Sequence, residues 1–293
     1  MKLFDLILLI TLAAIWGSSF IFMRASVEVF GPIALIAVRI IIAAACMFVF
    51  LFKKKRFHEF IQHWKVLFLV GLFSSAVSFS LLAYASLSLT GGTVSILNAM
   101  TPIFTALIAH FALNILMNRM QFFGMFISII GLLFLVWDKV SWNIDSWLPA
   151  LAGVGAALLY GVSNNLSKKY LSEVSIFTSS SGSLLFSAIF MSILLQFFMP
   201  DLNQISSRDW LYAIVLGVIC TALAYVIHFK LIKSIGPTRA STVTFLIPIF
   251  SFIWGYLLLN EQVTPRMIGA TAIILFGMSL VMGFLKLNKS VNT

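Results

Sequence analysis

The sequence predicts an all-α integral membrane protein in which ten transmembrane helices form two inverted five-helix repeats around a central cavity. Of the 293 residues, 61% are hydrophobic and only 10% are charged, against roughly 25% charged in an ordinary soluble domain. The apolar runs are long enough to cross a bilayer as helices, whereas the strands of a membrane barrel would alternate over about 10 residues. In addition, the second half of the chain repeats the pattern of the first.

Ten apolar runs are expected to span the membrane. They cover residues 4–23, 33–52, 66–87, 93–116, 121–137, 147–167, 176–198, 210–229, 240–259 and 267–285. The segments between them are short and rich in glycine, proline or charge, so they leave no room for a soluble domain. The first run follows Met1-Lys2 without a convincing cleavage site, and a second run follows at once, so we expect a retained helix rather than a signal peptide. Cys46 and Cys220 lie within apolar runs, so neither a disulfide framework nor a metal site is expected, and no cofactor is implied.

The fourth and ninth runs contain the clearest repeat. Residues 93–111 and 239–257 share Pro-Ile-Phe at an offset of 146 positions, within matching polar stripes. The stripes are Ser95, Asn98, Pro102 and Thr105 in the first copy, and Ser241, Thr244, Pro248 and Ser251 in the second. Steps of 3, 4 and 3 put each stripe on one helical face. Pro102 and Pro248 are expected to kink their helices and to free the carbonyls of Asn98 and Thr244, which then need polar partners.

Further matches extend the repeat over the whole chain. Residues 13–19 resemble residues 157–163 at an offset of 144, and Gly131 matches Gly277 at 146. The chain therefore divides into five-helix units at residues 1–140 and 141–293. Because five is odd, the second unit must enter the membrane upside down, as in transporters that bind substrate between inverted repeats.

Lysine and arginine predict the orientation. With the N-terminus inside, fourteen of the nineteen basic residues lie on the inner side, four lie outside (Arg24, Lys139, Arg208 and Arg266), and Arg39 lies within a span. The positive-inside rule then places both termini in the cytoplasm. The protein is expected in the inner or plasma membrane. The net charge of +10 is explained by this bias, so no nucleic-acid partner is expected.

The sequence lacks the common motifs of soluble enzymes, and an enzyme is not expected. All nine carboxylates lie at or beyond the span ends, which argues against coupling through a carboxylate at the membrane midplane. His110 and His228 are expected to pack or to lie near the cytoplasmic interface. Arg39 has two interpretations: it snorkels or pairs structurally, or it meets an acidic group of the substrate.

Uncharged polar and aromatic residues are the candidates for substrate binding. They are Trp16, Ser19, Tyr84, Asn98, Thr105, Tyr160, Asn164, Tyr225, Thr244, Ser251 and Trp254. Such groups at membrane depth, in otherwise apolar walls, suit a zwitterion or a polar neutral solute. The alternatives are that the small polar residues and prolines only help helices pack, and that the tyrosines and tryptophans belong to interfacial belts.

Several short motifs together resemble the EamA-type transporters of the drug/metabolite transporter superfamily. They include Trp16-Gly17-Ser18-Ser19-Phe20, Arg39, Ala83-Tyr84 with Ser86, the two repeated prolines, and Asn260-Glu261 before Gly269. The resemblance implies a cavity lined by spans 1, 3, 4, 6, 8 and 9, and a gating or structural role for Arg39 and Glu261. Glu261 matches the Glu of the family's Gly-Glu motif, whereas the first half has Asn114-Ile115 there.

The sequence thus predicts a secondary transporter, in the export direction, for an amino acid or amino-acid-like zwitterion. Its partners would be the solute and the lipid bilayer, with monomer and dimer both open. Facilitated diffusion or exchange is favoured over strict proton antiport, because no midplane carboxylate is present. Two other functions stay open: efflux of drugs or amphipathic cations, which would need an acidic cavity residue, and lipid flipping, which would need a lateral opening.

Overall fold

In the computed structural model, which describes residues 2–136, 147–236 and 240–283, these residues form helices joined by short connections and contain no strand. The all-α fold is confirmed. The basic residues Lys139, Arg239, Lys286 and Lys289, the ends of the runs at 121–137 and 267–285, and the 140/141 boundary lie outside the described residues.

The helices follow the predicted runs closely. Their bounds are α1 Leu3–Phe30, α2 Pro32–Phe48, α3 Lys54–Gln62, α4 Trp64–Gly71, α5 Ser78–Ala85, α6 Gly91–Asn98, α7 Thr101–Leu113, α8 Arg119–Val136, α9 Leu148–Tyr170, α10 Ile176–Leu195, α11 Ser207–Gly217, α12 Ala224–Ile235, α14 Val243–Leu259 and α15 Pro265–Val281. Short 3₁₀ turns lie at Val49–Leu51 and Leu202–Gln204.

Six helical segments of the described chain are long and apolar enough to cross a membrane, and three apolar helices are shorter. The long ones are Leu3–Phe30, Pro32–Leu51, Trp64–Ala85, Gly91–Leu113, Ile176–Leu195 and Ser207–Ile235. The shorter ones are α8, α14 and α15. Helix α9 has 23 residues, but its second half carries two asparagines and two lysines. Each predicted run thus overlaps a helix, and the number of helices that cross the membrane stays a prediction.

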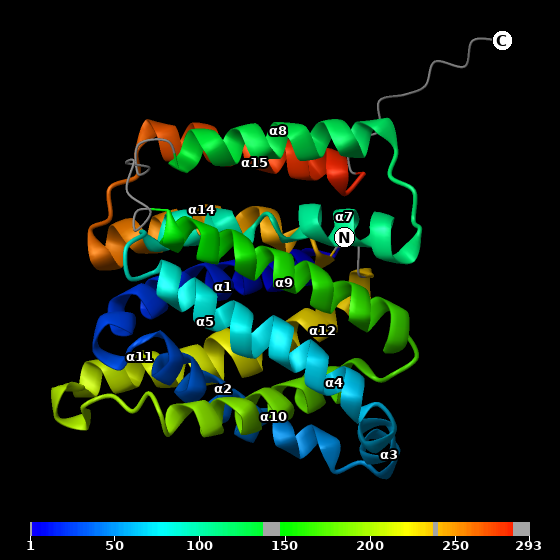
Figure 1. Ribbon diagram of the computed structural model, residues 1–293, viewed down its shortest axis with the longest axis vertical. Helices are drawn as coiled ribbons and strands as arrows, with labels where there is room; N and C mark the ends of the chain where they lie inside the picture. Colours follow the sequence, from blue (N-terminus) through cyan, green and yellow to red (C-terminus); the bar gives the residue numbers. More distant parts are fainter. Residues whose placement is uncertain (1, 137–146, 237–239, 284–293) are drawn as a thin grey trace.

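Helices from the two halves of the chain pack against each other in pairs. The most extensive contacts join α8 to α15, α1 to α14, α2 to α10 and α7 to α9. In Figure 1, α8 and α15 lie along each other at one edge of the molecule, and α2 and α10 lie toward the opposite edge. A Cβ on Gly124 would lie 2.5 Å from the Gly277 carbonyl oxygen, and one on Gly131 would lie 2.8 Å from Ile274 Cγ1. Residue numbers rise along α8 as they fall along α15, so this pair is antiparallel.

Two glycines hold the polar-stripe helices at equivalent crossings. A Cβ on Gly17 would lie 2.9 Å from the Ser251 nitrogen, and one on Gly161 would lie 2.9 Å from the Thr105 nitrogen. Gly17 and Gly161 match at an offset of 144, and Thr105 and Ser251 match at 146. The absence of a side chain therefore lets α1 approach α14, and α9 approach α7, in the same way.

Local backbone irregularities also occur in pairs. The third and eighth spans each contain one π-helical turn, at Leu72–Val77 and Val218–Leu223, again 146 positions apart. Such turns are rare and frequently mark functional sites. Asn114 and Asn260 end α7 and α14 in the same left-handed conformation, with φ 52° in both. Asparagine tolerates that conformation better than most residues.

The two repeated prolines act differently. Pro248 lies inside a continuous α14. In the first copy the helix is broken instead: α6 ends at Asn98, and Pro102 lies in the first turn of α7. Pro102 cannot donate to the Asn98 carbonyl, and the Thr101 hydroxyl donates to it at 2.7 Å. The predicted kink is therefore a helix break at Pro102.

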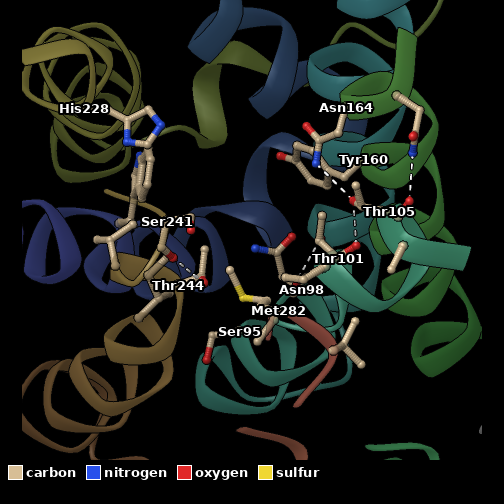
Figure 2. A pocket seen from close by; sticks show the side chains of 18 of the residues that line it. Ser95, Asn98, Thr101, Thr105, Tyr160, Asn164, His228, Ser241, Thr244 and Met282 are labelled. Carbon is tan, nitrogen blue, oxygen red and sulfur yellow. Dashed lines mark hydrogen bonds between the residues drawn. The ribbon is translucent and has the colours of Figure 1, made fainter. Parts of the chain in front are cut away.

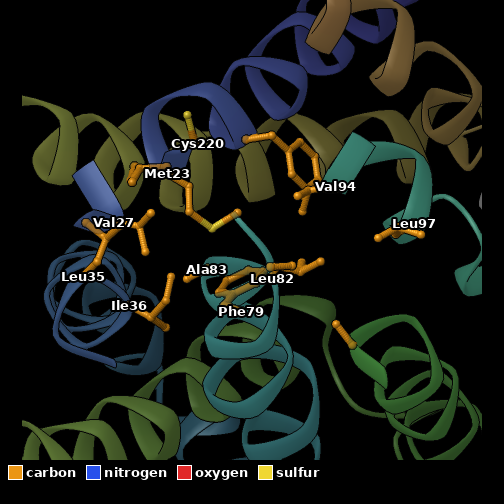
Figure 3. Packing of buried hydrophobic residues seen from close by; sticks show 14 of the residues in the cluster. Met23, Val27, Leu35, Ile36, Phe79, Leu82, Ala83, Val94, Leu97 and Cys220 are labelled. Atoms are coloured by element: carbon orange, nitrogen blue, oxygen red, sulfur yellow. The ribbon is translucent and has the colours of Figure 1, made fainter. Parts of the chain in front are cut away.

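A buried apolar cluster fills the bundle between α1, α2, α5 and α6. Figure 3 shows Met23, Val27, Ile36, Phe79 and Leu82 within it. Met23 and Ile36 are 1% and 0% exposed. Burial of such side chains contributes about 1.5–3 kcal/mol each in water, but within a bilayer close packing holds helices together instead. The helices of this part of the bundle are therefore closely packed through the cluster.

Candidate functional site

A cavity of about 810 Å³ lies beside this cluster, between the two halves of the chain. Side chains from α1, α2, α5, α6, α7, α8, α9, α10, α12, α14 and α15 and from the π-turn at Val218–Leu223 contribute to its wall. The volume is within the range that holds small molecules. Spans 1, 3, 4, 6, 8 and 9 all contribute to the wall, as predicted, and so do spans 2, 5, 7 and 10.

Most of the predicted binding residues line this cavity. They are Trp16, Ser19, Asn98, Thr105, Tyr160, Asn164, Tyr225 and Thr244, together with Arg39 and Pro102. Equivalent residues face it from both halves: Trp16 matches Tyr160 at an offset of 144, and Asn98 matches Thr244 at 146. Figure 2 shows Asn98 and Asn164 on one side of the pocket and Thr244 on the other.

Hydrogen bonds order one wall but leave acceptors free. The Asn164 amide donates to Thr105 Oγ1 at 3.2 Å, and the Asn165 amide donates to the Thr105 carbonyl at 2.9 Å. Two buried amide oxygens, Asn98 Oδ1 and Asn165 Oδ1, find no hydrogen-bond partner among the described residues. Buried polar atoms are nearly always paired. An orphaned acceptor in a cavity wall is therefore suited to a donor on a ligand or to water.

Arg39 is buried rather than snorkelling, with 4% of its surface exposed. Its Nε donates to Thr221 Oγ1 at 3.0 Å, and its Cζ lies 4.0 Å from the centre of the Phe79 ring. Thr221 belongs to the second π-helical turn. That turn therefore positions the one charged side chain of α2 at the cavity.

The cavity reaches the surface at one end of the bundle. Its wall includes Leu116, which is 84% exposed, and the exposed Lys168. At the opposite end, Glu261 Oε1 accepts a hydrogen bond from the Gly91 N–H at 3.0 Å, which joins the segment after α14 to the start of α6. Phe30 and Trp210 pack edge to face with centroids 5.2 Å apart. These contacts close that end.

Besides Glu261, four predicted residues lie outside the cavity wall. Tyr84 is 39% exposed, near the end of α5. Ser251 is 0% exposed, because α1 crosses it at Gly17. Pro248 is also buried in α14. The Trp254 indole N–H donates to the Ala14 carbonyl at 3.0 Å, so this N–H is already hydrogen-bonded within the protein.

The wall also contains residues that the predicted set omitted. His228 lies with its ring centre 5.2 Å from that of Trp16, and its buried Nδ1 has no partner within the described chain. Thr101, Asn165, Lys168 and Ser241 line the cavity as well. Membership of the polar stripe could have found Ser241, and adjacency to Asn164 could have suggested Asn165. Nothing in the local sequence distinguishes His228 from a packed histidine.

Comparison with known proteins identifies the family. The model of the EamA-like transporter family matches twice, over residues 3–137 and 147–283. The chain belongs to the EamA-like transporter family. The predicted resemblance to the drug/metabolite transporter superfamily is confirmed. Together with its apolar helices, this membership makes the chain a multi-pass membrane protein with a transporter role.

Relatives of this EamA-like chain match it over nearly its whole length. The uncharacterized transporter YoaV of Bacillus subtilis is 26% identical, covering 92% of this chain and 93% of that protein. Protein PagO of Salmonella typhimurium is 23% identical, covering 90% of both. A solved structure superposes with a TM-score of 0.68 at 15% identity, covering 98% of this chain and 100% of the other. At that identity the likeness concerns the fold alone.

Proposed function

We propose that this EamA-like chain is a secondary transporter that exports an amino acid or an amino-acid-like zwitterion by alternating access. One observation carries the proposal: a cavity of about 810 Å³, walled by equivalent residues of both halves, reaches the surface at one end and is closed at the other. Its wall combines aromatic faces with amide oxygens that have no partner among the described residues. Those groups suit a small solute that has both polar and apolar parts.

The two halves, residues 1–140 and 141–293, would be inverted repeats that exchange conformations. The antiparallel packing of the matching helices α8 and α15 supports this, as do the equivalent crossings at Gly17 and Gly161. Thr105 lines the open end, and its counterpart Ser251 is buried with its hydroxyl unpaired among the described residues. After the exchange Ser251 would line the cavity and Thr105 would be packed.

The structure would then be the inward-open state. The open end carries Lys168, and the termini and most of the basic residues are expected on the same side, in the cytoplasm. Both termini would be cytoplasmic and the membrane would be the inner or plasma membrane. No described residue of the cavity wall is Asp or Glu. That supports facilitated diffusion or exchange over strict proton antiport, and it disfavours an amphipathic-cation cargo.

Transport by purified protein in proteoliposomes tests this function. Each of the twenty radiolabelled amino acids is offered in counterflow, with and without an imposed pH gradient, and protein-free liposomes serve as the control. We expect saturable movement of at least one amino acid at a rate that does not depend on the gradient. Movement of tetraphenylphosphonium or of a fluorescent phospholipid, but of no amino acid, would contradict the proposal.

A further inference from the structure

Arg39 is held rigidly where it meets the cavity. Its Nε–H is committed to Thr221 Oγ1, and the Thr221 hydroxyl in turn donates to the Leu216 carbonyl at 2.8 Å. The guanidinium carbon lies over the Phe79 ring, 4.0 Å from its centre. A side chain fixed by one hydrogen bond and one ring contact loses little further entropy when it binds a ligand.

The remaining donors of Arg39 have no hydrogen-bond partner among the residues that the structure describes. A guanidinium has five N–H groups, and the single hydrogen bond that Arg39 makes with the described residues uses only the Nε–H. The four N–H groups on the two terminal nitrogens make no hydrogen bond with any described residue, and Arg39 is part of the cavity wall. Paired terminal nitrogens are the geometry that binds a carboxylate through two parallel hydrogen bonds.

The charge of Arg39 is not balanced by the cavity. Among the described residues of the wall, Arg39 and Lys168 are cationic and none is acidic. Removing a cation from water without a counter-ion costs several kcal/mol. The protein tolerates this arrangement if the solute supplies the missing negative charge.

Groups suited to the other pole of a zwitterion also line the cavity. Asn98 and Asn165 line the cavity, and their buried Oδ1 atoms, which have no partner among the described residues, are acceptors of the kind that an ammonium needs. The aromatic rings of Trp16 and Tyr160, also in the wall, attract a cation through their faces. A zwitterion has a place for each end in this wall.

The second half has no arginine at the position equivalent to Arg39. The Arg39 carbonyl lies 3.0 Å from the position of a Cβ on Gly217, and the Ser183 carbonyl approaches Gly71 in the same way. Ser183 is thus the counterpart of Arg39, at an offset of 144. The matched aromatic residues Trp16 and Tyr160 line the cavity from both halves, whereas the charge of Arg39 comes from one half alone, so the cavity offers one strong site for an anion.

We infer that Arg39 binds the carboxylate of the transported solute and thereby selects carboxylate-bearing metabolites over their neutral or cationic derivatives. The inference rests on the transport role proposed above and names the residue that would give it specificity. It assigns to Arg39 direct contact with substrate rather than a purely structural role.

Thermal stabilisation of the purified protein tests the contact, since a ligand of the folded state raises its melting temperature. The probes are matched pairs: phenylalanine and phenylalaninamide, leucine and leucinamide, benzoate and benzamide, with phenyl phosphate as a separate anion. We expect at least one carboxylate to stabilise the wild type while its amide does not. In Arg39→Gln the dissociation constant of that carboxylate should rise about 30-fold or more, the effect of truncating one partner of a buried charge pair.

Two further variants separate binding from folding. Arg39→Lys keeps the charge but loses the paired donors, so it should bind the carboxylate more tightly than Arg39→Gln and less tightly than the wild type. Arg24→Gln, on α1 outside the cavity wall, should bind as the wild type does. Equal stabilisation by a carboxylate and its amide, stabilisation by phenyl phosphate alone, no stabilisation by any carboxylate, or unchanged binding in a folded Arg39→Gln protein would overturn the inference.

The transport assay distinguishes this failure from failure of the proposed function. A protein that moves phenylalaninamide or leucinamide as fast as the parent amino acid is a transporter in which Arg39 does not select carboxylates. A protein that binds carboxylates through Arg39 but moves no solute supports the site and contradicts the function.

Discussion

Glu261 offers the sharpest test of how the closed end is held. Its carboxylate accepts a hydrogen bond from the Gly91 N–H at the N-terminus of α6, where the helix dipole favours negative charge. A hydrogen bond to a charged group contributes about 1.5–3 kcal/mol. Because Glu261 is partly exposed, we take about 1.5–2 kcal/mol as its contribution. Glu261→Ala should then shift the equilibrium toward opening of this end by about 10- to 30-fold.

Labelling of a buried cysteine measures that shift. Ser251→Cys, introduced after Cys46 and Cys220 have been changed to serine, places a thiol at a site that is 0% exposed. A membrane-impermeant maleimide added from the outer side should react about 10- to 30-fold faster when Glu261→Ala is also present. The control is Glu28→Ala, which removes a carboxylate that is 63% exposed and paired with Arg24. Labelling at the same rate in the Glu261 and Glu28 variants would refute the reasoning.

Other substitutions test the cavity wall and its packing. Asn98→Leu should reduce transport about 10-fold or more, through loss of a polar contact worth about 1.4 kcal/mol. Its melting temperature should change little. The control Asn203→Leu, in the 3₁₀ turn before α11, should have no effect on transport. Thr244→Leu should act as Asn98→Leu does, and normal transport by both variants would mean that these side chains only pack. Gly161→Ala should destabilise the protein by about 1–3 kcal/mol through overpacking, since its Cβ would lie 2.9 Å from backbone atoms of α7. Gly155→Ala, on the same helix but with only a 3.7 Å contact, should not lower the melting temperature.

The helices and the family could be predicted because a bilayer constrains the sequence strongly. A segment in hydrocarbon must pair its own backbone groups and present apolar side chains over about 20 residues. The positions and lengths of the apolar runs therefore predict where the helices lie. The repeat went further, since it paired Gly17 with Gly161 before any contact was known.

The differences between the halves were harder to predict. Pro102 and Pro248 occupy matching positions, yet only the first copy breaks. The residue before the first proline is Thr101, whose hydroxyl donates a hydrogen bond to the Asn98 carbonyl. The second copy has Ile247 at that position, which has no such donor. That signal was present in the sequence.

The sequence contains little signal for the direction in which each side chain faces. Helices that are apolar on every face give little periodic signal, so nothing local indicated that Tyr84 faces outward. Trp254 is satisfied by the Ala14 carbonyl, a contact between residues 240 positions apart. Ser251 and Thr105 match in sequence but differ in exposure. A repeat predicts which residues are equivalent, and not which half of the cavity is open.

Distances between spin labels at the two ends of the cavity test the central claim most directly. One pair joins Lys168 on α9 to Lys233 on α12, and the other joins their counterparts Arg24 and Leu87, at offsets of 144 and 146. On addition of the amino acid that is transported, the account predicts a shorter distance between Lys168 and Lys233 and a longer one between Arg24 and Leu87, within the same population of molecules. If the two distances change in the same direction, or if neither responds to a solute that is transported, exchange between inverted halves is contradicted.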